Sequence, residues 1–229
     1  MLKAYKFRLY PNKEQEVYFS KCFGSVRFIY NKMLNDKIEY YKKNNKMLNN
    51  TPAQYKKEFP WLKEVDSLAL SNAQMNLDKA YKNFFRNKNI GFPKFKSKKN
   101  NCYSYTTNNH KTTVRIVDNK YIKLPKLKTL VRIKQHRQIP KDGKIKSATI
   151  SQNPSGKYYI SILVEQEIKE LPKNEFAIGI DLGLADFAIT SDGVKYSNPR
   201  YLRKSLNKLA KEQRKLSRKK NGSKNKNKQ

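Results

Sequence analysis

The sequence predicts an α+β protein in which a small β-barrel is interrupted by an inserted helical unit and followed by a second, shorter α/β region. Three observations predict this order. Residues 1–11 alternate between basic and apolar side chains, residues 12–90 carry apolar side chains at helical spacing, and residues 91–172 contain short strand-like runs separated by turn residues. Residues 173–229 begin a different sheet.

Residues 1–11 are the expected first strand of the barrel. Apolar and basic side chains alternate along this stretch, which is the period of a half-buried strand. Pro11 ends the pattern because its nitrogen cannot donate to a sheet. The expected inward residues are Tyr5, Phe7 and Leu9, and the expected outward residues are Ala4, Lys6 and Arg8.

Residues 12–90 are the expected helical unit. Spacing near 3.6 residues predicts two helices, at 12–22 and 25–44, with a break at Gly24. Thr51-Pro52 is typical of the start of a further short helix. Asp66 or Ser67 is the expected cap of a last helix. Its apolar face is expected to hold Leu68, Met75, Leu77, Ala80, Tyr81, Phe84 and Phe85.

Residues 89–107 are expected to form an extended loop and no part of the core. The stretch holds Pro93 between two aromatic residues and is rich in lysine, a composition that suits a segment that follows a nucleic-acid backbone.

Five further strand-like runs complete the expected barrel in residues 91–172. Turn residues separate them at Asp118-Asn119 and at Pro154-Ser155-Gly156. The runs are residues 113–117, 121–125, 130–136, 145–152 and 158–167, and the N-terminal strand is expected to join them.

Residues 171–175 are an expected polar linker into the last region. Residues 176–193 predict a strand, a glycine-containing turn and a returning strand. Pro199 precedes an expected helix over residues 200–219, and a low-complexity tail follows.

The charge of the chain indicates a polyanionic partner. The sequence has 51 Lys and Arg residues against 18 Asp and Glu residues, a net charge of +33 on 229 residues. Phosphates would neutralise this charge and release counterions, so DNA or RNA is the expected partner. No apolar stretch approaches the roughly 20 residues of a spanning helix, and no signal-peptide core is seen. We expect a cytoplasmic protein that does not bind membranes.

The cysteine and aromatic residues give weaker evidence about function than the charge does. Cys22 and Cys102 lie far apart without CxxC spacing, so we expect reduced thiols and neither a zinc site within residues 1–229 nor a disulfide framework. The 15 Tyr and 11 Phe residues could stack on unpaired bases or fill the core.

Asp181 is the candidate catalytic and metal-binding residue. An apolar strand delivers this carboxylate beside Gly183, where RNase H-like nucleases need a ligand for Mg²⁺ or Mn²⁺. Two such ions, roughly 4 Å apart, would stabilise the attacking and leaving oxygens. Similar turns bind phosphate in sugar-kinase and actin-like folds, and a structural Asp at a turn is a third reading.

Segments along the chain resemble the TnpB (OrfB) proteins of insertion-sequence transposons, relatives of the compact type V CRISPR nucleases. The resemblance implies a wedge-type barrel, a helical recognition unit and a RuvC-like domain that cuts DNA under RNA guidance. It also implies that Asp181 is the first RuvC carboxylate. The segments are KAYKFRLYPNKEQ, FGSVRFIYNKML, IGFPKFKSKK, ATISQNPSGKYYISILVE and AIGIDLGLADFAITSDG, in the family's order.

The chain also departs from the family pattern. The later RuvC Glu and Asp and the four-cysteine zinc ribbon are missing, so residues 173–229 are expected to be an incomplete RNase H-like (RuvC) domain. We expect a truncated protein that does not cleave by itself, and a second polypeptide could supply the missing part. The acids that match no family catalytic position are Asp186, Asp192, Glu165 and Glu167.

The expected partners are guide RNA and target DNA. The candidate nucleic-acid-binding residues are Lys6, Arg8, Arg27, Lys94, Lys96, Lys98, Lys99, Arg203, Lys204, Lys211, Arg214, Lys215 and Arg218. An alternative is a sequence-specific transposase accessory protein or repressor that acts through a helix-turn-helix at residues 12–45. An RNA-associated chaperone is a third possibility.

Overall fold

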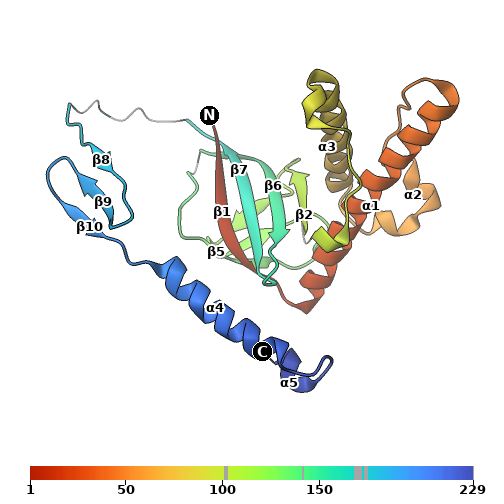
Figure 1. Cartoon of the computed structure of the whole chain (residues 1–229). Coiled ribbons are helices and arrows are strands. Elements are labelled where there is room, and N and C mark those ends of the chain that lie inside the picture. Colours follow the sequence, from red (N-terminus) through yellow and green to blue (C-terminus); the bar gives the residue numbers. More distant parts are fainter. Residues whose placement is uncertain (101–102, 141, 168–171, 173–174, 229) are drawn as a thin grey trace. The chain divides into compact units, whose positions relative to one another are not determined.

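The computed structural model describes residues 1–100, 103–140, 142–167, 172 and 175–228 (Figure 1). The expectations for Cys102 and for most of the 171–175 linker lie outside the described residues. Two compact units divide the chain, residues 1–169 and residues 170–229, and each is described by itself.

The first unit contains a seven-stranded sheet in which the N-terminal strand is central. Strand β1 (Leu2–Tyr10) pairs antiparallel with β7 (Tyr158–Glu165) on one side and β5 (Val131–Lys134) on the other. The full order is β2-β6-β7-β1-β5-β4-β3, and Figure 1 labels β1, β2, β5, β6 and β7 of this sheet. The remaining strands are β2 (Tyr103–Asn108), β3 (Arg115–Val117), β4 (Tyr121–Lys123) and β6 (Lys144–Gln152).

The predicted barrel is found as a curled half-barrel of seven strands. In the described part of the chain its edge strands β2 and β3 do not pair with each other. The predicted hairpin turns are confirmed: Asp118 and Asn119 have φ angles of 50° and 53°, as a tight two-residue turn requires. Gly156 also has positive φ, and its N–H donates to the Asn153 carbonyl.

The inner face of the half-barrel forms one core with the helices. The predicted alternation of β1 is confirmed, because Tyr5, Phe7 and Leu9 are buried. Phe19 and Phe23 of helix α1 (Lys13–Asn44) pack against aromatic side chains of β2 and β7. This packing fixes the first half of α1 on the sheet.

The predicted helix break at Gly24 is wrong, because α1 runs without interruption through it. A glycine inside a helix costs only about 1 kcal/mol relative to alanine. Burial of the flanking apolar residues offsets this cost. A capping box between Asn12 and Gln15 stabilises the first turn, and Asn45 in the left-handed conformation ends the last.

The other helical elements follow the prediction more closely. Asp66 caps α3 (Ser67–Arg86) by accepting from the Leu68 N–H. The predicted short helix begins later than Thr51-Pro52. The expected apolar face of α3 is partly wrong, because Met75 and Phe85 are exposed. The short elements are α2 (Tyr55–Glu58) and the 3₁₀ turns Pro60–Lys63, Lys88–Ile90 and Lys98–Asn100.

Strand β2 is a second correction, because the sequence predicted a loop there. Tyr105 and Thr107 are buried, and β2 pairs with β6 over its whole length. The segment YSYTTN is polar and has lysine-rich neighbours, which is typical of a loop. Its alternate residues nevertheless face the core, as in a strand.

The second unit is a small sheet followed by helices. Strand β9 (Asp186–Thr190) pairs with β8 (Ile180–Asp181) and β10 (Lys195–Ser197), so the predicted hairpin is confirmed. Helix α4 (Tyr201–Ser217) matches the predicted helix, and a short α5 (Lys224–Asn227) lies in the expected tail. Among the described residues, no helix combines the length and apolar character needed to cross a membrane.

Candidate nucleic-acid interface and the Asp181 hairpin

Residues 91–100, here called the strap, run along α1 and are fixed at two points. Phe92 packs edge-on against Tyr81 and Phe84 of α3, at centroid distances of 5.5 and 5.4 Å. Further along, the Asn31 side chain donates to the Lys96 carbonyl (2.9 Å) and accepts from the Lys96 N–H (2.8 Å). The strap is therefore held against α1 and α3, although its residues before Lys98 belong to no helix or strand.

Three adjoining pockets lie between α1, the strap and the β2 side of the sheet, and together they form what we call the α1 groove. Their volumes are about 280, 310 and 520 Å³. Arg27 lines all three, and Phe95 lines two of them. None of the described residues that line these pockets is acidic.

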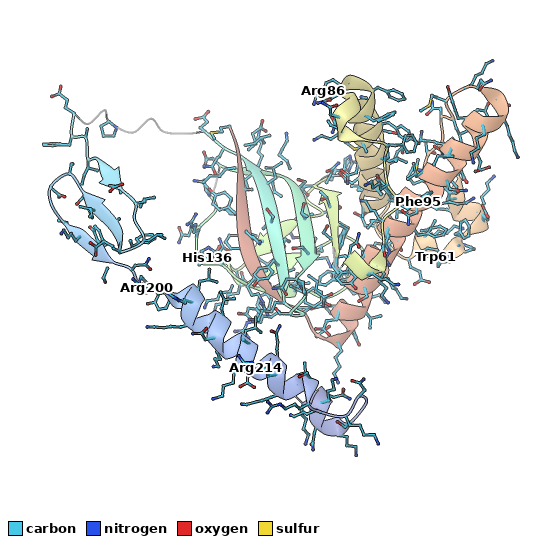
Figure 2. The ribbon with its side chains drawn as sticks, viewed as in Figure 1. Trp61, Arg86, Phe95, His136, Arg200 and Arg214 are labelled. Carbon is cyan, nitrogen blue, oxygen red and sulfur yellow. The ribbon has the colours of Figure 1, made fainter. Side chains whose placement is uncertain are left out.

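The strap presents one aromatic ring and several cations at this groove. Phe95 is 54% exposed and lies beside α1 (Figure 2). Lys98 lines the groove, and Lys94 and Lys99 are exposed. Lys96 also lines the groove, and its ammonium lies 4.1 Å from the centroid of the Tyr30 ring. An exposed ring beside cations is an arrangement on which a base can stack while its phosphate is neutralised.

The outer face of the half-barrel carries a second group of cations. On this face Arg8 is opposite Tyr159 of β7 and Lys134 of β5. Five side chains alternate there as cation and ring at 5.1–5.7 Å, a set we call the cation–aromatic ladder. In order these are Lys6, Tyr159, Arg8, Tyr10 and Arg132.

Arg8 is the centre of this ladder. Its guanidinium lies 5.2 Å from the Tyr159 ring centroid and 5.5 Å from that of Tyr10, and it donates to the Tyr159 hydroxyl at 3.4 Å. Its Nε is buried without a hydrogen-bond partner among the described residues. The rings therefore orient Arg8 without neutralising it.

In the second unit, α4 carries the remaining candidate cations on a helix none of whose residues is buried. Leu202, Leu206 and Leu209 are all more than half exposed. One of these cations, Lys215, pairs with Glu212 at 2.8 Å. The six candidates are Arg203, Lys204, Lys211, Arg214, Lys215 and Arg218, of which Figure 2 labels Arg214.

Asp181 ends β8, opposite Ile189 of β9, and is exposed. Gly183 follows in the turn, where an added Cβ would lie 3.1 Å from the Asp186 carbonyl oxygen. A glycine here avoids a tight contact between the two sides of the turn. The geometry presents the Asp181 carboxylate to solvent.

The other candidate acids do not group with Asp181. They are hydrogen-bonded within the hairpin or lie in the first unit. A hydrogen bond from the Thr190 hydroxyl holds the pKa of Asp192 below its ordinary value. Glu165 lies in the first unit, where a hydrogen bond from Lys146 lowers its pKa. Across the described residues, no three His, Cys, Asp or Glu side chains are grouped closely enough to hold a metal ion. Asp181 alone does not fit a two-metal site, which needs several oxygen ligands from the protein.

The structure thus sorts the sequence candidates into separate surfaces. Arg27 and Lys98 meet in the α1 groove, whereas Lys6 and Arg8 lie on the outer face of the sheet. Sequence reasoning missed the ladder partners Tyr10, Tyr159 and Arg132. The alternation of β1 placed Tyr10 on the same face as Arg8, but strand register, which brings Tyr159 and Arg132 beside them, is not readable from local pattern.

Two family models match the chain. One, described as a helix-turn-helix domain of the OrfB proteins of IS605-type elements, matches residues 1–57. The other, described as a probable transposase of the same proteins, matches residues 160–229.

Curated relatives match nearly the whole chain. It is 33% identical over 233 residues to a putative RNA-guided DNA endonuclease of Streptomyces pristinaespiralis, covering 99% of this chain and 57% of that protein. It is 35% identical over 228 residues to the putative RNA-guided DNA endonuclease InsQ of Escherichia coli K12, covering 95% and 54%. The chain therefore spans about half the length of these two relatives.

A shorter relative and a solved structure are also similar. The virulence protein VsdF of Salmonella dublin is 38% identical over 113 residues, which cover 43% of this chain and 95% of VsdF. A CRISPR-Cas12f ternary complex aligns with a TM-score of 0.45 at 12% identity, covering 94% of this chain and 55% of that one. The two model matches and the identity to the long relatives show that the chain belongs to the TnpB (OrfB) family of insertion-sequence transposon proteins.

Proposed function

We propose that this chain binds guide RNA and target DNA, in the manner of the RNA-guided DNA endonucleases that its long relatives are named for. The observation that carries the proposal is the grouping of cations and exposed rings in the α1 groove and the cation–aromatic ladder, because the described pocket linings of the groove contain no acid. Such surfaces neutralise phosphates and stack bases.

We propose that each region of the sequence has its own structural role. Residues 1–11 and 91–172 form a wedge-like half-barrel, residues 12–90 a recognition unit, and residues 173–229 the first elements of a RuvC-like domain. The candidate cations of each surface contact nucleic acid, and the protein acts in the cytoplasm.

No cleavage step is assigned to this chain. Asp181 is proposed to be one carboxylate of a family site for Mg²⁺ or Mn²⁺, but the described residues supply no companions for it. The activity of the long relatives would require ligands that the described residues do not provide.

Binding at graded salt tests the proposal. Full-length chain is titrated with transposon-end RNA and with the same sequence as duplex DNA. We expect tighter binding of the RNA, and log Kd that rises linearly with log salt concentration, by nearly one unit of slope per neutralised phosphate. An affinity for the RNA that does not change with salt contradicts the proposal.

A second candidate is a DNA-binding transposase accessory protein or repressor, favoured by the match of residues 1–57 to a helix-turn-helix model. The uninterrupted α1 weighs against a turn at Gly24, where that function would place it. A clear preference for the duplex in the same titration favours this second function.

A further inference from the structure

The packing of α1 does not explain why residue 24 is a glycine. It lies inside a 32-residue helix, where glycine is unfavourable compared with alanine, and the helix neither bends into a turn nor ends there. A Cβ built on Gly24 meets no atom within 4 Å in the described part of the chain. No packing contact of the described protein therefore requires the side chain to be absent.

Gly24 lines part of the α1 groove. It lines the pockets of about 280 and 520 Å³, which share Arg27. It also lines a neighbouring pocket of about 390 Å³ that includes Glu64. With spacings of three and four residues, one face of α1 presents a polar stripe made of Ser20, Gly24, Arg27, Asn31 and Asn35. At 1.5 Å per residue the stripe is roughly 22 Å long, and a side chain at Gly24 would interrupt it.

We propose that the α1 groove binds an unpaired stretch of RNA, with its sugar-phosphate backbone passing directly over Gly24. This rests on the proposed nucleic-acid function and names the part of the surface that takes single-stranded nucleotides. Arg27 neutralises a phosphate, and Phe95 stacks on a base. Close approach to the helix backbone is the physical reason for a glycine at that place.

The groove lining favours RNA as the occupant. Besides its cations it contains hydroxyl and amide side chains from three elements, among them Ser20, Ser104 and Gln152. These groups can hydrogen-bond the 2′-hydroxyls that distinguish RNA from DNA.

Substitutions of Gly24 test whether the glycine serves RNA binding or the stability of the fold. Gly24→Ala and Gly24→Leu are compared with Asn76→Ala and Asn76→Leu, which change an exposed position of α3 outside these pockets. The full chain is titrated with a short fluorescein-labelled oligouridylate and with its deoxy counterpart, and its thermal midpoint is measured. All four variants are expected to keep or raise the midpoint, because Ala and Leu are better helix formers than Gly and Asn.

Only the Gly24 variants are expected to lose affinity for the oligouridylate, by about tenfold for Gly24→Leu and less for Gly24→Ala. Arg27→Gln gives a second test if Gly24→Leu fails to fold, and it should weaken binding while reducing the salt slope by about one. Wild-type affinity in Gly24→Ala and Arg27→Gln overturns the assignment of the groove, and equal affinity for the deoxy oligomer overturns RNA as the occupant. Failure of the wild-type chain to bind either the oligouridylate or transposon-end RNA would instead overturn the proposed function as well.

Discussion

Asn31 and Lys96 are joined by two hydrogen bonds of opposite direction across 65 residues of sequence. The bonds connect the middle of α1 to a segment with little regular structure, so they set where Phe95 and the strap lysines stand. Both bonds go to the backbone of Lys96, which makes this pair a sensitive point for testing the groove.

Replacing Asn31 with Ala should loosen the strap. The loss of two hydrogen bonds at an exposed site should destabilise the fold by about 1 kcal/mol, but the Lys96 amide should exchange its hydrogen markedly faster. Hydrogen exchange of residues 91–100 measures this. Asn35→Ala, one turn further along α1, serves as the control, and unchanged exchange in Asn31→Ala would show that Phe92 alone fixes the strap.

Arg8→Gln should weaken RNA binding if the cation–aromatic ladder contacts phosphate. We expect the salt slope of log Kd to fall by about one, since one phosphate contact is lost. Folding should be retained, because Tyr159 and Tyr10 keep their positions in the sheet. Lys46→Gln, at the end of α1, is a matched loss of one exposed charge. Equal slopes for the two variants would remove Arg8 from the interface.

Asp181→Ala should leave RNA binding and stability unchanged, because the carboxylate is exposed and has no ion pair among the described contacts. We also expect no Mg²⁺-dependent DNA cleavage by this exact chain, with or without the substitution. A nuclease assay with transposon-end RNA and labelled target DNA checks both. Robust cutting that disappears in Asp181→Ala would show that other residues of the chain complete a metal site.

Cys22 makes stability sensitive to alkaline pH. Burial against α3 and β2 raises the pKa of its thiol from an ordinary value of 9.0 to about 12. The folded state therefore keeps this proton more tightly than the unfolded state, so the contribution to stability is complete below pH 9 and is lost as pH rises toward 12. Burial shifts the pKa of Tyr105 in the same direction.

Two measurements check this prediction. The thermal midpoint should fall steadily above about pH 9, and less steeply in Cys22→Ala, where only the tyrosines contribute. In a Cys102→Ser background, a thiol reagent at neutral pH should modify Cys22 only after denaturant is added. Rapid labelling of the native protein would show that α1 opens locally around this residue.

The local sequence pattern predicted which segments form strands, helices and turns better than it predicted which strands pair with each other. The strand at the N-terminus, the cap at Asp66 and the turn at Asp118-Asn119 depend on nearby residues and were confirmed. The position of β1 between β7 and β5 depends on contacts more than a hundred residues away, which no periodicity contains.

Two of the wrong assignments, the helix break at Gly24 and the loop at β2, have a common physical cause. Gly24 and the polar residues of β2 are unfavourable for a helix and a strand by amounts near 1 kcal/mol, and tertiary burial of Phe23 and Tyr105 outweighs those preferences. The same limit applies to the candidate site. Residue type identified Arg8 and Arg27 as cations, but only register and packing show that they face different surfaces.

The central place of β1 has a consequence for synthesis of the protein. Strand β1 is made before both of its neighbours, so one of its edges stays unpaired until β5 ends at residue 134 and the other until β7 ends at residue 165. Helix α1 can form early, whereas completion of the sheet must wait, as expected for a topology dominated by distant pairings. A nascent chain halted before β7 would thus carry an unprotected, lysine-rich strand edge, and cellular folding factors would meet the protein first in that form.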